Sequence, residues 1–137
     1  MDDSLSRTYE KASVPSERIK AILKLQESGF DVAMRLSPMI EPYMDFQRLN
    51  ALKIDKCVVE FLRVNSWIEK WFDIDYSKYT VSQSGYKHLP LDEKKKIVSK
   101  IKIPTITVCE DVTEHYEYWK EHFNPNKEDC CNLRRTT

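Results

Sequence analysis

Glycine is scarce in this chain of 137 residues, which contains only Gly29 and Gly85. An average composition would be about 7% glycine. A P-loop or a dinucleotide-binding fingerprint needs two or three glycines within a few residues, because the backbone must approach a phosphate closely. The sequence therefore excludes both of these nucleotide-binding classes.

The chain also lacks a net charge and long apolar runs. Its 22 basic side chains balance 22 acidic ones, so no overall electrostatic attraction draws it to nucleic acid or to an anionic membrane. No apolar stretch is long enough to span a bilayer, and the amino-terminal residues do not resemble a secretory signal. With 41% hydrophobic residues, we expect one folded domain over residues 1–125 and a polar, cysteine-containing tail over 126–137.

Cysteine occurs four times without the spacing of a metal-binding or redox motif: Cys57, Cys109, Cys130 and Cys131. No CxxC is present, and a disulfide between the two adjacent cysteines would be strained. This irregular set argues against a secreted disulfide framework and predicts a reducing, cytoplasmic setting. No spacing among the cysteines and histidines requires a zinc site.

Apolar residues recur in blocks that alternate between helical and strand-like spacing. Strands are predicted over residues 31–37, 56–64 and 105–109. Pro38 is expected to end the first strand, because proline cannot donate to a sheet ladder. Helices are predicted from Ser16, as N-cap, to Gly29, over 45–52, from Asn65 through Trp71, over 90–101 and over 112–123.

Strands that alternate with helices predict right-handed crossovers and an α/β fold with a parallel sheet. Only about three strands are recognisable, and a sheet of three parallel strands leaves apolar edges open, which proteins normally avoid. The fold class expected is therefore the carboxyl-terminal part of a partial TIM-type barrel. We expect the isolated chain to associate with the other part of such a barrel or with itself.

Seven residues in the first third of the chain form an ordered series. A glutamate precedes a short loop with a proline, an arginine opens a helix, a glycine ends it, and the next strand finishes in arginine, one further residue, serine and proline: Glu10, Pro15, Arg18, Gly29, Arg35, Ser37 and Pro38. This stretch resembles the late barrel region of radical S-adenosylmethionine enzymes, close to the spore photoproduct lyase-like branch. The segments VVEFLRVNSWI and TITVCEDVTEHYEYW are similar to the next two strand–helix units.

The resemblance implies an iron–sulfur enzyme of lyase type that uses S-adenosylmethionine and a [4Fe–4S] cluster. In that family a CxxxCxxC motif holds the cluster, and this sequence has no such spacing. We therefore expect the chain to contribute barrel closure and part of the pocket, but to bind neither cofactor and to be inactive alone. Its expected partner is the amino-terminal half of the same barrel. The alternative is a non-catalytic α/β module with a binding or structural role.

The candidate site residues lie at the predicted strand ends, where α/β barrels place their chemistry. The resemblance places Arg35 and Ser37 near the adenosyl portion of the cofactor, although Arg35 could instead form a structural ion pair with Glu60. Glu60 and Arg63 are three residues apart on the second predicted strand, so we expect them to face opposite sides of the sheet. Each either lines the substrate pocket or belongs to a structural ion pair.

Cys109 ends the third predicted strand and is followed by two acidic residues. It could line the substrate pocket or bind a metal together with Cys130 and Cys131, but a buried cysteine is more often a small apolar side chain. Adjacent cysteines in a tail more often have no role.

The aromatic residues and the histidines give weaker indications of a functional site. An aromatic cluster could stack on nucleobases: Trp67, Trp71, Phe72, Tyr76, Tyr79 and Tyr86. Basic residues are not concentrated around it, and packing inside a helical core explains Trp67 and Trp71 as well. The three histidines, His88, His115 and His122, lie in polar segments that we expect to be exposed. No nucleophilic triad and no carboxylate pair in an apolar setting is recognisable, which argues against an independent hydrolase.

Overall fold

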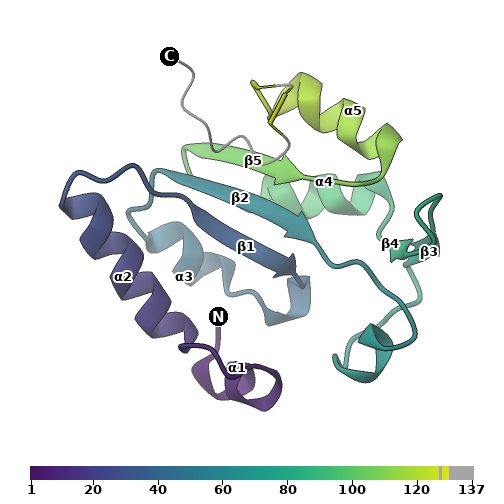
Figure 1. Cartoon of the computed structure of the whole chain (residues 1–137), viewed down its shortest axis with the longest axis horizontal. Helices are drawn as coiled ribbons and strands as arrows, with labels where there is room; N and C mark the ends of the chain where they lie inside the picture. Colours follow the sequence, from purple (N-terminus) through teal and green to yellow (C-terminus); the bar gives the residue numbers. More distant parts are fainter. Residues whose placement is uncertain (127, 130–137) are drawn as a thin grey trace.

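A three-stranded parallel sheet forms the centre of the molecule. The computed structural model of the chain describes residues 1–126 and 128–129. Its main sheet contains β1 (Met34–Met39), β2 (Lys56–Phe61) and β5 (Thr105–Cys109), in the order β1-β2-β5 and with all strands parallel (Figure 1). The predicted α/β class and parallel sheet are confirmed. Among the described residues β1 and β5 each pair with β2 alone, so the sheet is open and no barrel is closed.

The first two strands differ in length from those predicted, while β5 matches its predicted bounds. β1 begins at Met34 instead of residue 31 and continues through Pro38 to Met39. The expectation that Pro38 ends this strand is wrong, because β1 lies at an edge of the sheet, where a residue without an N–H is tolerated. β2 ends at Phe61, three residues before the predicted end.

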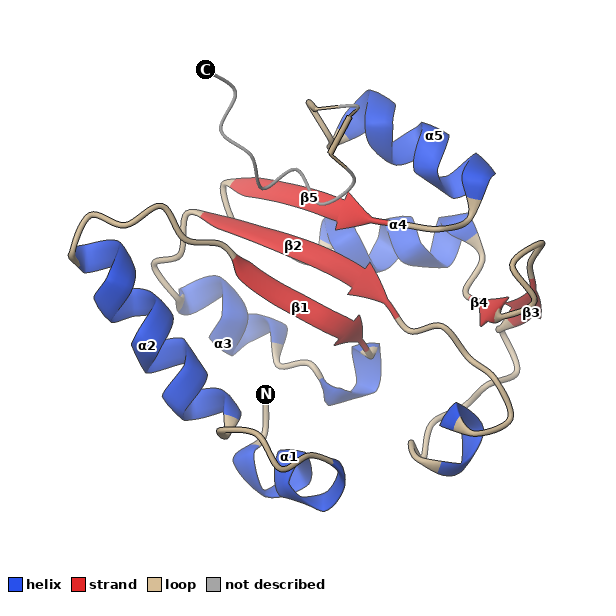
Figure 2. Cartoon of the chain, viewed as in Figure 1, coloured by secondary structure: helices blue, strands red, loops and turns tan. Residues whose placement is uncertain are grey.

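Helices connect and flank the strands (Figure 2). The α-helices are α1 (Asp3–Tyr9), α2 (Pro15–Glu27), α3 (Phe46–Ala51), α4 (Leu91–Ser99) and α5 (Thr113–His122), and two short 3₁₀ helices cover Glu41–Tyr43 and Ile68–Lys70. The sequence predicted α2, α3, α4 and α5, but not α1. None of the described helices has the length and apolar character needed to cross a membrane.

Polar contacts at the helix ends explain several boundaries. The Asp45 side chain accepts a hydrogen bond from the backbone N–H of Arg48 at 2.9 Å and caps α3. The expected N-cap of α2 is wrong, since Val14 occupies that position. Ser16 instead donates its backbone N–H and its hydroxyl to the Asp3 carboxylate, at 3.0 and 2.5 Å. These two bonds join α2 to α1.

The apolar core lies on one face of the sheet. Figure 1 shows α3 and α4 behind the strands. Their buried side chains join those of the sheet and Trp119 of α5 in a single cluster: Leu49, Cys57, Val59, Phe61, Ile97, Val98, Val108 and Trp119. Three side chains of α2, Ile19, Ile22 and Leu23, also pack against this cluster. Because successive strand residues face opposite sides, Arg35 and Glu60 are directed to the other face.

A small antiparallel hairpin stands at the carboxyl end of the sheet, in a segment that the sequence analysis treated as a loop. It pairs β3 (Thr80–Val81) with β4 (Lys87–His88). Gly85 in the turn has a φ of 82°, a conformation that favours glycine. Val64, just after β2, exchanges two backbone hydrogen bonds with Lys87. This pairing anchors β4, and with it His88, to the segment that follows β2.

Candidate functional site

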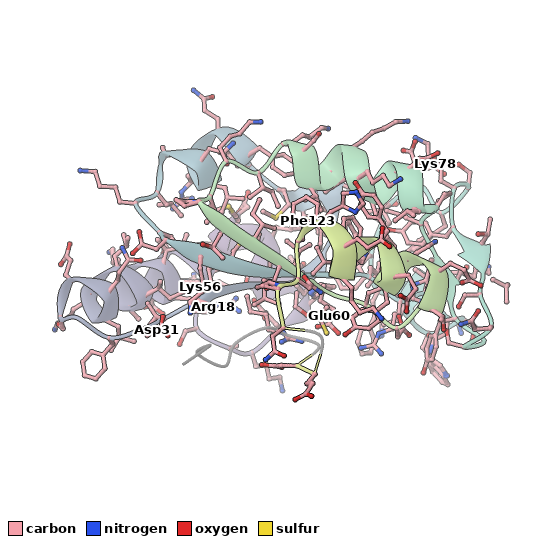
Figure 3. The ribbon with its side chains drawn as sticks, turned by 90° about the horizontal axis from the view of Figure 1, so that it is seen from above. Arg18, Asp31, Lys56, Glu60, Lys78 and Phe123 are labelled. Carbon is pink, nitrogen blue, oxygen red and sulfur yellow. The ribbon has the colours of Figure 1, made fainter. Side chains whose placement is uncertain are left out.

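A polar cluster centred on Glu60 occupies the sheet face away from α3 and α4. Glu60 lies near the carboxyl end of β2, but Arg35 is the second residue of β1, so the expectation that Arg35 stands at the carboxyl end of its strand is wrong. Glu60 Oε2 accepts hydrogen bonds from Arg35 Nη2 at 2.6 Å and from the Ser37 hydroxyl at 2.7 Å. Glu60 Oε1 accepts a third from Arg63 Nη2 at 2.8 Å. In Figure 3, Glu60 lies on the side of the sheet away from α3 and α4. The structure thus brings four of the predicted site residues together.

The expectation that Glu60 and Arg63 face opposite sides is wrong. β2 ends at Phe61, so the alternation of a regular strand does not extend to Arg63, and its guanidinium turns back to Glu60. The ion pair between Arg35 and Glu60, foreseen as the structural alternative for Arg35, is present. That contact does not test whether Arg35 and Ser37 bind a cofactor, and this role stays a prediction.

The electrostatics of the Glu60 cluster favour its charged form. Burial disfavours the carboxylate, but the hydrogen bonds from Ser37 and Arg35 and the positive charges of Arg35 and Arg63 outweigh burial. The pKa of Glu60 therefore lies below its usual value. Both arginine side chains remain nearly half exposed, at 46%, so part of each side chain is accessible to a ligand.

A second cluster, centred on Glu110, lies beyond the end of β5 and was not foreseen. Lys94, whose side chain is fully buried, places its Nζ 2.6 Å from Glu110 Oε2 and 3.1 Å from His115 Nδ1. Glu110 Oε1 accepts hydrogen bonds from the backbone N–H groups of Asp111 and Val112, at 3.1 and 3.2 Å. Each Glu110 oxygen thus has partners, as a buried carboxylate requires.

Burial dominates the acid–base behaviour of this second cluster. It lowers the pKa of Lys94, although the neighbouring Glu110 charge opposes the shift. Burial also acts on Glu110, but the charge and hydrogen bond of Lys94 prevail and hold the pKa of Glu110 below its usual value. His115 has a pKa lowered first by burial and then by the Lys94 charge.

His88 links the two clusters and contradicts the expectation of exposed histidines. It is buried, with a relative exposure of 2%, and its Nε2 lies 3.6 Å from Asp111 Oδ1. Asp111 in turn lies 3.8 Å from Arg63 Nη1. His115 is partly buried, whereas His122 is exposed as expected. The polar neighbours of His88 in the sequence concealed its burial, which depends on the hairpin folding back over the end of the sheet.

Two cavities adjoin these clusters. The larger, of about 620 Å³, lies against α1, α2 and β1, and its lining includes Arg18, Arg35 and Ser37. The smaller, of about 210 Å³, opens at the ends of β2 and β5 and is lined by Glu60, Phe61, Arg63, Cys109, Glu110 and Asp111. Cys109 therefore lines a cavity, as one of its two predicted roles requires.

The cysteines do not converge among the described residues. Cys57 is buried on the helical face of the sheet, and burial raises the pKa of its thiol to about 12. The predicted metal ligands Cys130 and Cys131 lie outside the described residues, so a metal site shared with Cys109 stays a prediction. In the part of the chain that the structure describes, the side chains grouped as metal ligands are instead His88, Glu110 and Asp111, whose ligand atoms lie within 4.8 Å of one another.

The two tryptophans expected to pack in a helical core are exposed. Trp67 and Trp71 have relative exposures of 68% and 65%. The segment forms only the 3₁₀ helix Ile68–Lys70, which Asn65 caps by accepting hydrogen bonds from two backbone N–H groups. A single helical turn buries little side-chain surface, so the packing interpretation is wrong. Stacking on nucleobases stays untested.

Comparison of the chain with protein-family models, with curated proteins and with solved structures gives no match. The resemblance to radical S-adenosylmethionine enzymes therefore depends on the residues between Glu10 and Pro38 and on the two later strand–helix segments. We therefore infer the function from the geometry of the two clusters and from the unpaired edges of the sheet among the described residues.

Proposed function

We propose that this chain supplies the carboxyl-terminal strands of a radical S-adenosylmethionine barrel, and that Arg35, Ser37 and Glu60 contact the cofactor or the substrate there. The observation that carries the proposal is the Glu60 cluster. Three polar side chains from two neighbouring parallel strands meet around Glu60, near the carboxyl end of β2, on the sheet face away from α3 and α4. Barrels of this kind place their active sites at that end.

The arrangement of strands and helices supports the same proposal. Strands that follow one another along the chain, apart from the small hairpin, lie side by side in the sheet. Their apolar cluster with α2, α3 and α4 lies on one face, as in a barrel wall. The opposite face would then line the interior of the barrel. A charged cluster on that face is expected for a pocket and costly in a closed apolar core.

The open edge of β1 indicates where the remaining strands would pair. β1 is bonded on one side only among the described residues, and the cavity of about 620 Å³ runs along it, bordered by α2. Arg18 of α2 pairs with Glu10 beside this cavity. In the proposal the neighbouring strand comes from the other part of the barrel, either a preceding segment of a longer protein or a separate chain.

The [4Fe–4S] cluster of such an enzyme would be held by the other part of the barrel. Of the described cysteines, Cys57 faces the helices with a raised thiol pKa, whereas Cys109 lies at the far end of β5. These residues do not fit a cluster, which needs three converging thiolates. When bound, the cluster and S-adenosylmethionine would supply the radical chemistry. The role left to this chain is to bind: Arg35 presents N–H donors to an anionic group, and Glu60 orients Arg35.

The experiment combines this chain with an amino-terminal half-barrel that carries CxxxCxxC, produced with it and reconstituted anaerobically with iron and sulfide. We expect 5′-deoxyadenosine from S-adenosylmethionine only when both parts are present. Arg35→Gln should lower the yield at subsaturating S-adenosylmethionine, whereas Arg7→Gln, a change at an exposed position of α1, should not. A stable complex whose activity is unaffected by Arg35→Gln would contradict the binding role.

A chain that remains monomeric and never associates with such a half-barrel would favour the alternative, an α/β module without catalysis. Cleavage of S-adenosylmethionine by the chain alone, abolished by Cys109→Ala, would overturn the assignment of the cluster to the other part.

A further inference from the structure

His88 carries an unmet hydrogen-bonding requirement. Among the described residues, its two ring nitrogens are the buried side-chain atoms without a hydrogen-bond partner. Buried polar groups in folded proteins are nearly always paired, and an exception calls for a strained, catalytic or ion-binding explanation. The 3.6 Å between His88 Nε2 and Asp111 Oδ1 is too long for a hydrogen bond.

His88, Glu110 and Asp111 have side chains of the types that bind metal ions, and they lie close together. Glu110 and Asp111 immediately follow β5, while His88 comes from β4, so three ligands from two elements converge. One ligand atom from each residue lies within 4.8 Å of the other two. Tetrahedral ligands of a transition metal at bond lengths near 2.1 Å stand about 3.4 Å apart, so closing onto an ion needs each ligand atom to move by about an ångström or less.

We propose that His88, Glu110 and Asp111 form a mononuclear site for a divalent transition metal such as Zn²⁺. One imidazole and two carboxylates suit this class of ion. Three protein ligands leave a coordination position open, and the cavity of about 210 Å³ borders both carboxylates. That position would take water or a small oxygen ligand. This site adjoins the Glu60 cluster through Asp111 and Arg63, but its ligands are different residues and its existence does not depend on the proposed function.

Lys94 would compete with the metal ion for the Glu110 carboxylate. Its ammonium lies 2.6 Å from Glu110 Oε2, where it neutralises one of the two carboxylates. His115 Nδ1, at 3.1 Å from Lys94 Nζ, offers the ammonium an alternative partner as the ion approaches Glu110. Because like charges repel, the geometry implies that removing the ammonium strengthens metal binding.

The test uses the full chain with Cys130→Ser and Cys131→Ser, so that the tail thiols cannot bind the probe. Titration calorimetry with Zn²⁺ should give one ion per chain. His88→Asn should weaken binding at least about tenfold, since even loss of an outer partner of a metal ligand costs that much. His122→Asn, which changes the exposed histidine, is the matched control and should leave the affinity unchanged.

Two further variants keep the test decisive if His88→Asn fails to fold. Asp111→Asn should weaken binding to a similar extent, because Asp111 is partly exposed and not part of the apolar core. Lys94→Met should give a larger rise in melting temperature with Zn²⁺ than the parent shows. Unchanged Zn²⁺ affinity in His88→Asn or in Asp111→Asn would overturn the proposal.

Co²⁺ distinguishes this site from one that uses a thiolate. The proposed nitrogen and oxygen ligands give weak visible absorption bands and no intense thiolate charge-transfer band. An intense near-ultraviolet band that disappears with Cys109→Ser would assign the ion to Cys109 and would also overturn the proposal.

Discussion

Arg35 of β1 and Glu60 of β2 join across neighbouring strands, with 2.6 Å between Arg35 Nη2 and Glu60 Oε2. Arg35 stands opposite Val58 in the parallel register, so Glu60 is the next residue along β2 on the same face. The pair occupies the sheet face away from α3 and α4. It is therefore both a structural contact and the centre of the proposed binding surface.

Removing the charge of Glu60 should have a small effect on stability. Glu60→Gln removes the carboxylate that the two half-exposed arginines share, and contacts of this exposure contribute up to about 1 kcal/mol. We expect the free energy of unfolding, measured by urea titration at neutral pH, to fall by that amount. Ser37→Ala should produce a smaller loss. A loss of several kcal/mol would show that the cluster is essential to the fold.

The pH dependence of the same pair follows from the lowered pKa of Glu60. A carboxyl whose pKa is lower in the folded than in the unfolded state stabilises the fold above the unfolded value, and this contribution disappears as the pH falls through the folded value. The ordinary pKa of a glutamate is 4.5. The difference in unfolding free energy between the parent and Glu60→Gln should therefore be largest above pH 4.5 and should shrink below it. A difference that grows on acidification would contradict the assigned shift.

Breaking the buried pair of Lys94 and Glu110 should lower the free energy of unfolding much more than removing the charge of Glu60. In the absence of metal, Lys94→Met leaves the Glu110 charge buried and uncompensated, which typically costs about 3–5 kcal/mol. The double variant Lys94→Met/Glu110→Gln should recover most of that loss, because no unpaired charge remains. Lys78→Met is the control: Lys78 pairs with Glu93 at 2.8 Å on the surface, and its loss should leave the free energy of unfolding almost unchanged.

The edge of β1 and the adjoining cavity should control self-association. Ala21 is exposed on α2 and lines the larger cavity, so Ala21→Lys places a charge where an apolar neighbour would bind. Sedimentation should show a lower proportion of dimers or larger species for Ala21→Lys than for the parent. Ala12→Lys, at an exposed position away from the cavity, should behave like the parent. A parent chain that is strictly monomeric at all concentrations would contradict the prediction.

The two described cysteines should differ in reactivity. In a background with Cys130→Ser and Cys131→Ser, a disulfide reagent such as DTNB should modify Cys109, which is partly exposed beside the smaller cavity. Cys57 should react only after unfolding, since it is buried and its thiol pKa is about 12. Cys57→Ser should therefore leave the reactive thiol count of the folded chain unchanged. Rapid modification of both thiols would show that the sheet opens readily.

Local sequence patterns determined the main elements. The apolar run of residues 105–109 predicted β5 with its observed bounds. The helix predicted over residues 45–52 is α3, which follows its N-cap Asp45, and Gly29 has the φ of 83° expected after a helix. Alternation of strands with helices then predicted the parallel sheet. These features depend on neighbouring residues and on chain connectivity, which a sequence displays directly.

Short polar elements escaped prediction because distant contacts hold them. α1 is seven residues long, and an isolated helix of that length is not stable in water. It is held by hydrogen bonds such as those between Asp3 and Ser16. The β3–β4 hairpin has only two residues in each strand and depends on the pairing of Val64 with Lys87.

The sequence by itself determined which faces of the strands are apolar and that Arg35, Ser37 and Glu60 lie on two successive strands of one parallel sheet. Only the tertiary structure decided which charged and polar groups are buried. Lys94 and His88 lie in polar stretches, yet both are enclosed because the ends of β2, β4 and β5 and helix α5 meet around Glu110. Burial is set by packing between segments that are remote along the chain, and a local pattern carries no signal for it.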